Sequence, residues 1–364
     1  MTGDAADSAD AVDAGDSGEG AATVDERVAE AASLIGIDEL WSGQLLYVAV
    51  DLGVIDLLDS EPTSARQVAE ELDLHGDACY RFLRALSHFD VLEEDEEQRF
   101  SLTPVGELFQ ADHPHSVRHA LLVDRSPEWV RPMLHLDGLL REGGPTGFER
   151  AFGTTFFDYL ESNPDFAEAF NEHMSARTER EAELVLEALS DYEFEDFEHV
   201  CDVGGGHGLL LCRLLEAEPH LEGTVLELES VVAEEDRLWA PKLNIEDRCT
   251  YEVGDMFEAV PRADAYLLKV ILHDWEDGEC VDILSTVHEA APPDARLFVV
   301  EALVPGPEES HFAKRLDMTM MVHVGGRERT LAEYERIFER AGWTLVERWE
   351  PPEGPMSVLE ARKV

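Results

Sequence analysis

The hydrophobic and polar positions of the chain follow two patterns, one before and one after residue 190. In the first part, apolar residues recur at helical spacing, as in a long helix predicted over residues 41–55. Pro127, Pro132, residues 143–145 and residues 163–164 break this helical part. From His199 onward, short apolar runs alternate with helical stretches, which is typical of a parallel α/β sheet. The predicted strands are residues 200–203, 224–228, 250–253, 265–271 and 297–300.

A compact pattern between residues 64 and 102 predicts a winged helix. Ser64 can cap one short helix and Asp77 a second, and both helices have an apolar face at i, i+3, i+4 and i+7 spacing. Residues 91–92 and 99–102 then predict two short strands around an acidic tip. Helix, turn, helix and two-stranded wing is the order of a winged-helix domain.

The charge of the chain decides between the two common uses of such a domain, DNA binding and subunit packing. The predicted wing tip, residues 93–97, consists of five carboxylates where a DNA reader would face phosphates. The chain has 80 Asp and Glu against 28 Lys and Arg, a formal net charge of −52. We therefore expect neither nucleic acid nor an anionic membrane as a partner.

The acidity extends over the whole chain. Only eight of the 80 acids lie in residues 1–26, for which little apolar content predicts a disordered tail up to residue 24. The apolar fraction of 44% is ordinary for a folded core. Lysine is nearly absent, and the composition resembles that of proteins from salt-accumulating halophiles. Molar salt would screen the self-repulsion, because the Debye length falls to about 3 Å at 1 M.

The five cysteines form no CxxC pair, and no apolar run reaches the length of a membrane span. The N-terminus shows no signal-peptide pattern. We therefore expect free thiols and a cytoplasmic location.

A glycine-rich loop follows the first strand of the predicted sheet. Its glycines are Gly204, Gly206 and Gly208, preceded by Asp202, whereas a dinucleotide fingerprint would need glycine at Leu209. The spacing Asp-x-Gly-x-Gly-x-Gly is the form seen in S-adenosylmethionine enzymes. Glycine permits a sharp turn and a close approach of ligand to the helix start.

Two acids end the next strands, where a nucleoside needs them. Glu227 is placed to accept hydrogen bonds from the ribose hydroxyls, and Asp255 from the adenine amino group. Met256 and Phe257 would flank the ring. A single acid at a strand end means little in so acidic a chain, but three such loops at the same sheet edge are stronger together.

The fourth strand ends in a histidine followed by a helix. His273 at the carboxyl end of a sheet is well placed as a general base near neutral pH. The alternative is that His273 or Asp274 only caps the helix. We expect Asp274 to be the cap, because Asp is favoured there, and His273 to be the base, because capping does not call for imidazole.

Residues from about 34 to 363 resemble the small-molecule O-methyltransferases of the caffeate, hydroxyindole and bacterial polyketide type. These enzymes combine an N-terminal, mainly α winged-helix dimerisation domain with an α/β Rossmann-like methyltransferase domain, whose seven-stranded sheet is mostly parallel. We therefore expect this fold and a homodimer. The matching segments are residues 202–208, 254–257, 268–275, 300–305 and 325–330.

The resemblance also implies roles for single residues. His273 matches the catalytic base, and Glu301 and Glu328 match two acids that flank it. Glu227 departs from the family, in which the ribose-binding acid is usually aspartate, and the loop before Gly325 is one residue shorter than in plant members. The positions that match cofactor contacts are Gly206, Gly208, Glu227, Asp255, Met256 and Lys269.

Four parts are therefore expected along the chain. They are the tail over 1–24, a winged-helix dimerisation domain over 25–125, a helical linker with substrate-pocket helices over 126–190, and an S-adenosylmethionine-binding catalytic domain over 191–364. Thr330 and Glu333 predict a capping box for a helix over 331–341. One further group either lines an aromatic pocket or, as is commoner at helical spacing, belongs to the core: Trp129, Phe170, Met174, Met318, Met320 and Met321.

The expected reaction moves a methyl group from S-adenosylmethionine to the hydroxyl oxygen of a small aromatic or enolic molecule. His273 would remove the proton as the oxygen attacks in line. We identify no ligand cluster for a metal and expect none. Two alternatives remain: a ligand-responsive regulator, which the acidic wing opposes, and a relative with other chemistry such as hydroxylation or decarboxylation, which the presence of His273 opposes.

Overall fold

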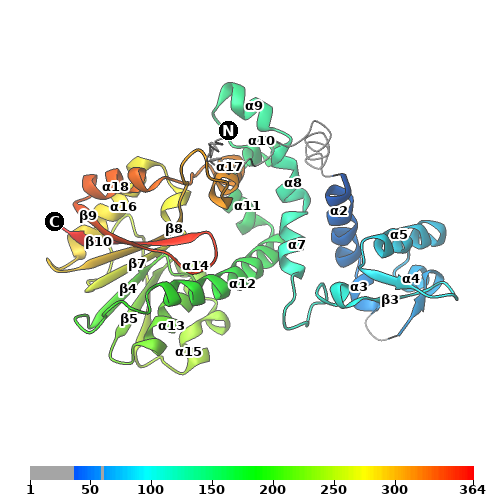
Figure 1. The fold of residues 1–364 in the computed structure, drawn as a ribbon, viewed down its shortest axis with the longest axis horizontal. Coiled ribbons are helices and arrows are strands. Elements are labelled where there is room, and N and C mark those ends of the chain that lie inside the picture. Colours follow the sequence, from blue (N-terminus) through cyan, green and yellow to red (C-terminus); the bar gives the residue numbers. More distant parts are fainter. Residues whose placement is uncertain (1–36, 59–60) are drawn as a thin grey trace, which may run out of the picture.

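The computed structural model describes residues 37–58 and 61–364. A small N-terminal domain and a larger sheet domain lie at opposite ends of the molecule, with helices between them (Figure 1). The tail predicted for residues 1–24 lies outside the described residues. The division of the chain at residues 125 and 190 stays a prediction.

The N-terminal domain has the helix, helix and wing order that the sequence predicts, with corrections in detail. Ser64 forms a capping box with Gln67, as expected. The cap of the next helix is His75 instead of Asp77, whose side chain lies inside the first turn. The predicted long helix is interrupted because Gly53 adopts a left-handed φ of 75°. The elements are α2 (Ile37–Asp51), α3 (Val54–Leu57), β1 (Thr63–Ser64), α4 (Ala65–Glu71), α5 (Gly76–His88), β2 (Leu92–Glu94) and β3 (Arg99–Leu102), with the strands in the order β1-β3-β2.

Helices alone connect the two domains. Pro127 and Pro164 stand in the first turn of a helix, where the missing N–H costs nothing. Pro132, predicted as a break, lies inside α8 one residue before its end. The helices are α6 (Pro104–Glu107), α7 (Arg118–Asp124), α8 (Pro127–Met133), α9 (Leu136–Glu142), α10 (Gly147–Phe152), α11 (Phe156–Ser162) and α12 (Pro164–Ala188).

The C-terminal sheet has seven strands in the order β6-β5-β4-β7-β8-β10-β9, and β10 alone runs antiparallel to its neighbours. The fold class expected from the resemblance is therefore confirmed. The five strands predicted from hydrophobicity are all present, with ends that differ by one or two residues. The strands are β4 (His199–Val203), β5 (Glu222–Glu227), β6 (Cys249–Val253), β7 (Ala265–Lys269), β8 (Arg296–Ala302), β9 (Trp343–Trp349) and β10 (Met356–Lys363).

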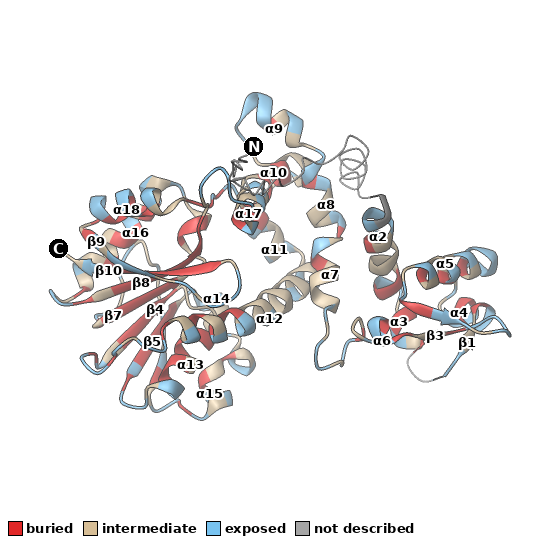
Figure 2. Cartoon of the chain, viewed as in Figure 1, coloured by how far each residue is buried: buried red, intermediate tan, exposed pale blue. Residues whose placement is uncertain are grey.

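Hydrophobic cores lie on both faces of this sheet, and its central strands are buried (Figure 2). One core contains residues of α12, α13, α15 and α17, and the other contains residues of α16 and α18. The chain order reverses at β4, between β5 and β7, so a crevice opens at the carboxyl ends of these strands. The remaining elements are α13 (Leu209–Ala217), α14 (Glu229–Val232), η1 (Glu235–Arg237), α15 (Trp239–Leu243), η2 (Leu272–Asp274), α16 (Asp277–Ala290), α17 (Phe312–His323) and α18 (Leu331–Arg340).

Among the described residues, we find no helix with the length and apolar character needed to cross a bilayer.

Candidate active site

The loop between β4 and α13 is shaped by its glycines. Gly204, Gly206 and Gly208 have φ values of 69°, 59° and 85°, in the left-handed region that side chains rarely adopt. A Cβ atom on Gly208 would lie 2.7 Å from the hydroxyl of Tyr251, whereas one on Gly206 would meet no atom within 4 Å. The loop is therefore packed on one side and faces open space on the other.

Two adjoining cavities lie between this loop and α12. They share Met174 and Thr178 of α12 with Gly205 and Gly206 of the loop. One cavity extends to Trp239 and the other extends along the end of β7. The structure thus brings together four of the predicted cofactor residues on the wall of the second cavity: Asp202, Gly204, Gly206 and Lys269.

The other predicted cofactor residues lie outside the lining of both cavities. Glu227 ends β5, and its Oε2 accepts a hydrogen bond from the Leu228 amide at 2.5 Å. Asp255 is exposed and accepts from the Phe257 amide at 2.9 Å. Met256 and Phe257 pack against the core that contains α16. Their contacts with a cofactor stay predictions.

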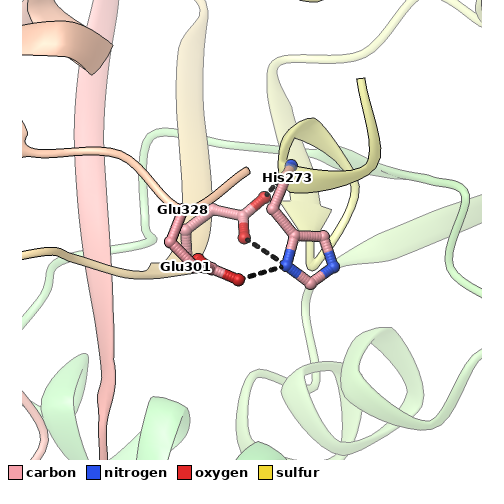
Figure 3. A group of neighbouring side chains, drawn as sticks. All are labelled: His273, Glu301 and Glu328. Carbon is pink, nitrogen blue, oxygen red and sulfur yellow. Dashed lines mark hydrogen bonds and ion pairs between the residues drawn. The ribbon is translucent and has the colours of Figure 1, made fainter. Parts of the chain in front are cut away.

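The turn after β7 brings the three predicted catalytic residues together. His273, on η2, is buried, and its Nδ1 lies 2.8 Å from Oε1 of Glu328 and 3.8 Å from Oε2 of Glu301. Both carboxylates stand on the Nδ1 side of the ring, and Nε2 points away from them (Figure 3). Nε2 lies 3.6 Å from Oδ1 of Asp274.

The two glutamates make different contacts with this turn. Glu328 binds the imidazole directly. Glu301 is fully buried, and its Oε1 accepts from the backbone amides of Ile271, Leu272 and His273 at 3.2, 2.9 and 3.3 Å. Glu328 is therefore placed to orient the ring, and Glu301 to hold the backbone that carries it.

The charges around His273 set its basicity. Burial by itself lowers the pKa of His273, but the carboxylates of Glu301, Glu328 and Asp274 outweigh it and raise that pKa to about 9. Burial also raises the pKa of Glu301 to about 7 and that of Asp274 to about 6. The imidazole is thus a stronger base than a free histidine.

The prediction that Asp274 caps the following helix is wrong. The cap of α16 is Glu276, which forms a capping box with Glu279. Asp274 belongs instead to η2, so the short helical turn ends before α16 begins. The capping box of Thr330 and Glu333 is confirmed at the start of α18.

Close packing also makes these side chains a possible ligand set for a metal. One atom each of His273, Glu301 and Glu328 lie within 4.8 Å of one another. However, Nδ1 is already bonded to Glu328, and Oε1 of Glu301 accepts from three backbone amides. The expectation of a metal-free reaction stays a prediction.

Two protein-family models match the chain, one in its C-terminal part and one in its N-terminal part. Residues 133–344 match the O-methyltransferase domain, and residues 36–112 match the O-methyltransferase dimerisation domain. This chain belongs to the O-methyltransferase family. It is an S-adenosylmethionine-dependent O-methyltransferase, and the comparisons favour neither a regulator nor a relative with other chemistry.

Relatives with known names are similar to this chain over most of its length. The phenazine O-methyltransferase of Lysobacter antibioticus is 32% identical over 328 residues, which cover 89% of this methyltransferase and 93% of the relative. The solved mitomycin 7-O-methyltransferase has a TM-score of 0.82 at 32% identity and covers 93% of this chain and 100% of its own. An O-methyltransferase from neocarzinostatin biosynthesis was solved with S-adenosyl-L-homocysteine and 1,4-dihydroxy-2-naphthoic acid. Its TM-score is 0.76 at 29% identity, with 88% of this chain and 96% of its own covered.

The second cavity of the methyltransferase fits the amino-acid end of this cofactor. Oδ1 of Asp202 is buried without a hydrogen-bond partner among the described residues, and burial raises the pKa of this carboxyl to about 7. Lys269 lies on the same wall, with its Nζ 2.7 Å from Glu181 of α12. A carboxylate that lacks a donor and a nearby ammonium suit the ammonium and carboxylate of a methionyl group.

Sequence reasoning missed two residues near the predicted cofactor site, Glu181 beside Lys269 and Tyr251 beside the glycine loop. Glu181 joins Lys269 to α12 and also pairs with Arg177 at 2.6 Å. The Tyr251 hydroxyl donates to the carbonyl of His207 at 2.8 Å and accepts from the Trp239 amide at 3.2 Å, so it ties the loop to α15. No local motif marks either residue, because each acts on a segment distant in sequence.

The methionines and aromatic residues left open by the sequence do not form one pocket. Met320 is buried in the core and Met318 is partly exposed, whereas Met174 lines both cavities. Trp129 stacks on His323 with ring centroids 4.2 Å apart, and Phe170 packs against Phe156 at 5.0 Å. The core interpretation is thus confirmed for Met320 alone.

Proposed function

We propose that His273 is the general base of this methyltransferase and that Glu328 keeps its imidazole in the productive tautomer. A carboxylate can only accept, so the neutral ring donates Nδ1–H to Glu328 and presents the Nε2 lone pair. S-adenosylmethionine supplies an electrophilic methyl group on its sulfonium. Nε2 would remove the acceptor hydroxyl proton as the oxygen bonds to the methyl carbon and the methyl–sulfur bond breaks, with S-adenosyl-L-homocysteine as the leaving group. The resulting imidazolium is stabilised by Glu328 and Glu301.

The observation that carries this proposal is the placement of both glutamates at Nδ1, whereas Asp274, 3.6 Å from Nε2, lies beyond hydrogen-bond distance on the other side of the ring. Both glutamates lie at Nδ1, and Nε2 points away from them (Figure 3). Glu301 fixes the turn through three backbone amides, so the ring direction follows from the fold before any acceptor binds. A histidine that served only packing would not need two buried carboxylates.

Substitution of the histidine tests this role. We expect His273→Ala to lower kcat by about 10²- to 10⁴-fold, the usual loss of general-base assistance, while affinity for S-adenosyl-L-homocysteine changes by less than about threefold. Calorimetry measures the affinity, and a radiolabelled methyl donor measures the rate. Retention of a tenth of the activity with an acceptor that stays protonated would refute the role.

The acceptor is a small aromatic hydroxyl compound. The support comes from the names of the relatives, which include a phenazine and a dihydroxynaphthoic acid, both aromatic. The rings of Trp129, Phe156, Phe170 and His323 pack against one another where α8, α11, α12 and α17 meet, so they do not by themselves offer a pocket for the acceptor.

Isotope labelling identifies the acceptor class. The enzyme is incubated with small-molecule extracts and with a panel of naphthols, catechols and aliphatic alcohols, together with methyl-labelled donor. We expect label in aromatic ethers, detected by mass spectrometry. Label in an aliphatic ether, or in an N-methyl product, would contradict the proposed class. His273→Ala is the control for enzyme-dependent transfer.

The active form is a homodimer joined through the dimerisation domain. Residues 36–112 match that domain, and α2 exposes Leu40 and Trp41, at 59% and 57% of their surface. A net charge of −52 on each chain repels across the roughly 30 Å Debye length at 0.01 M salt. We expect a dimer in molar salt that dissociates and then unfolds on dilution. A monomer detected by light scattering at high salt would contradict the expected dimer. A folded dimer at low salt would contradict the expected dependence on salt.

The cytoplasmic location stays a prediction.

A further inference from the structure

Both the backbone amides and the backbone carbonyls of the turn that carries His273 have side-chain partners. Glu301 accepts from the amides, and Arg329 donates to the carbonyls. Arg329 is 1% exposed, and its Nη1 donates to the carbonyl of Leu272 at 2.8 Å and its Nη2 to that of Trp275 at 2.6 Å. Its Nε donates to Oδ1 of Asp277 at 2.9 Å. The guanidinium therefore spans the turn from just before His273 to just after it.

The backbone next to Arg329 contacts the same turn. The amide of Arg327 donates to the carbonyl of His273 at 2.8 Å. A Cβ atom on Gly326 would overlap that carbonyl, so only glycine allows the two segments to approach. Residues 326–329 thus bind three backbone carbonyls of the turn, those of Leu272, His273 and Trp275.

The turn begins with a strained residue. Val270 has a φ of 57°, and a β-branched side chain in the left-handed region is an outlier. Such strain persists only where the surrounding contacts hold the backbone in place. The groups that hold the chain beyond Val270 are Glu301 at the amides and Arg329 at the carbonyls.

We propose that Arg329 is a positioning residue for methyl transfer, which holds the strained turn so that His273 keeps its direction between Glu328 and the acceptor. The proposal rests on the proposed role of His273 as the base. Arg329 acts through the backbone of the turn and does not contact the reacting atoms.

The chemistry of arginine explains why this position needs it. A guanidinium is planar and presents donors in a fixed fork, whereas a lysine ammonium is a compact point charge on a flexible stem. Replacing Arg329 by lysine keeps the charge and loses the simultaneous contacts with Leu272, Trp275 and Asp277. A role in charge balance alone would survive that change, and a positioning role would not.

Arg329→Lys is therefore the test, with Arg248→Lys as its matched control. The Nη1 of Arg248 also donates to two carbonyls, those of Leu215 and Leu221 at 2.8 and 3.1 Å, but near the amino ends of the strands, opposite the site. For each variant, kcat, the Kd for S-adenosyl-L-homocysteine and deuterium uptake of residues 271–276 are measured.

We expect Arg329→Lys to lower kcat about 10- to 100-fold, the range for a misplaced catalytic group, with the Kd changed less than about threefold. Deuterium uptake of residues 271–276 should rise. Arg248→Lys should change neither kcat nor that uptake. If Arg329→Lys does not fold, Asp277→Ala removes one acceptor of the guanidinium and should give a smaller change in the same direction.

An unchanged kcat and unchanged uptake in Arg329→Lys would overturn the proposal, as would equal losses in both arginine variants. Failure of the base itself is distinguishable, because His273→Ala would then keep its activity whatever Arg329→Lys does.

Discussion

Two loops face the ligand crevice, and they are held in opposite ways. The loop after β4 takes its shape from Gly204, Gly206 and Gly208, and a neutral hydroxyl of Tyr251 supports it. The turn after β7 contains no glycine. It bends through Val270 in a strained conformation and is surrounded by buried charges.

The difference follows from what each loop does. The glycine loop must leave room for a ligand, so missing side chains are its main feature. The base turn must aim one side chain, so its amides, its carbonyls and its imidazole each have a separate partner. The glycines that shape the loop after β4 are therefore local in sequence, with Tyr251 as a distant support, whereas the turn after β7 depends on Glu301 and residues 326–329, which are all distant in sequence.

The pH dependence of activity tests whether the buried carboxylates around the turn after β7 control the basicity of His273. Three carboxylates, those of Glu301, Glu328 and Asp274, raise the pKa of His273 to about 9, and the base must be neutral. Activity is therefore lost as pH falls through that pKa, and kcat/KM should drop about 50-fold from pH 9 to pH 7.

An acceptor whose hydroxyl stays protonated over this range is required for that measurement. A flat profile between pH 6 and 9 would mean that the buried acids do not control the base. His273→Ala should show no ascending limb.

Removal of the Glu227 carboxylate, near the glycine loop, tests whether this side of the crevice binds the cofactor. We expect Glu227→Ala to weaken S-adenosylmethionine binding by about 2 kcal/mol, or roughly 30-fold, because a carboxylate that accepts from ribose is lost. Calorimetry measures the change. Exposed Glu229, which follows it in the chain, provides the control Glu229→Ala. Equal affinities of the two variants would show that Glu227 serves only the Leu228 amide.

A smaller effect is expected at the hydroxyl that supports the same loop. Tyr251→Phe leaves the ring in place and removes the hydrogen bonds to His207 and Trp239. We expect the Kd for S-adenosyl-L-homocysteine to rise about fivefold, corresponding to about 1 kcal/mol, with kcat changed little. A loss of kcat without a loss of affinity would mean that the two loops are coupled.

Metal removal should have the smallest effect. Dialysis against a chelator is expected to change kcat by less than about 1.5-fold, because Nδ1 of His273 is bonded to Glu328 and the proposed mechanism uses Nε2 as a base without a metal. Activity that is lost on chelation and restored by a divalent ion would assign the His273, Glu301 and Glu328 cluster to a metal.

The sequence predicts the parts of this molecule that depend on neighbours in the chain. The capping boxes of Ser64 and Thr330, the turn that follows β4 and the five apolar strands all arise from local spacing. The resemblance adds His273 and its two acids. Even locally, two errors occur: Gly53 interrupts a helix whose apolar pattern continues, and His75 caps where Asp77 has the more usual side chain.

What the sequence does not predict depends on tertiary packing. Asp274 has the residue type of a cap, but the turn placed between β7 and α16 moves the cap to Glu276. Glu301 and Glu328 are equivalent in sequence, and only their contacts separate one that binds backbone from one that binds the ring. Arg329, Tyr251 and Glu181 each make a contact with a residue more than 40 positions away, and no local pattern marks those contacts.

The strand order also has a consequence for the order in which the sheet can form. β10 lies between β8 and β9, although it follows both in the chain. β9 pairs with β10 and with no other strand of the described sheet, and β8 keeps one edge open until β10 pairs with it. Ser357 of β10 pairs opposite Glu301, so the acid beneath the turn after β7 gains its neighbour on that side only when the C-terminal strand is in place. The pairings of β4, which precedes the glycine loop, with β5 and β7 do not involve β10. We therefore expect loss of the last strand to disturb the turn that carries His273 more than the glycine loop.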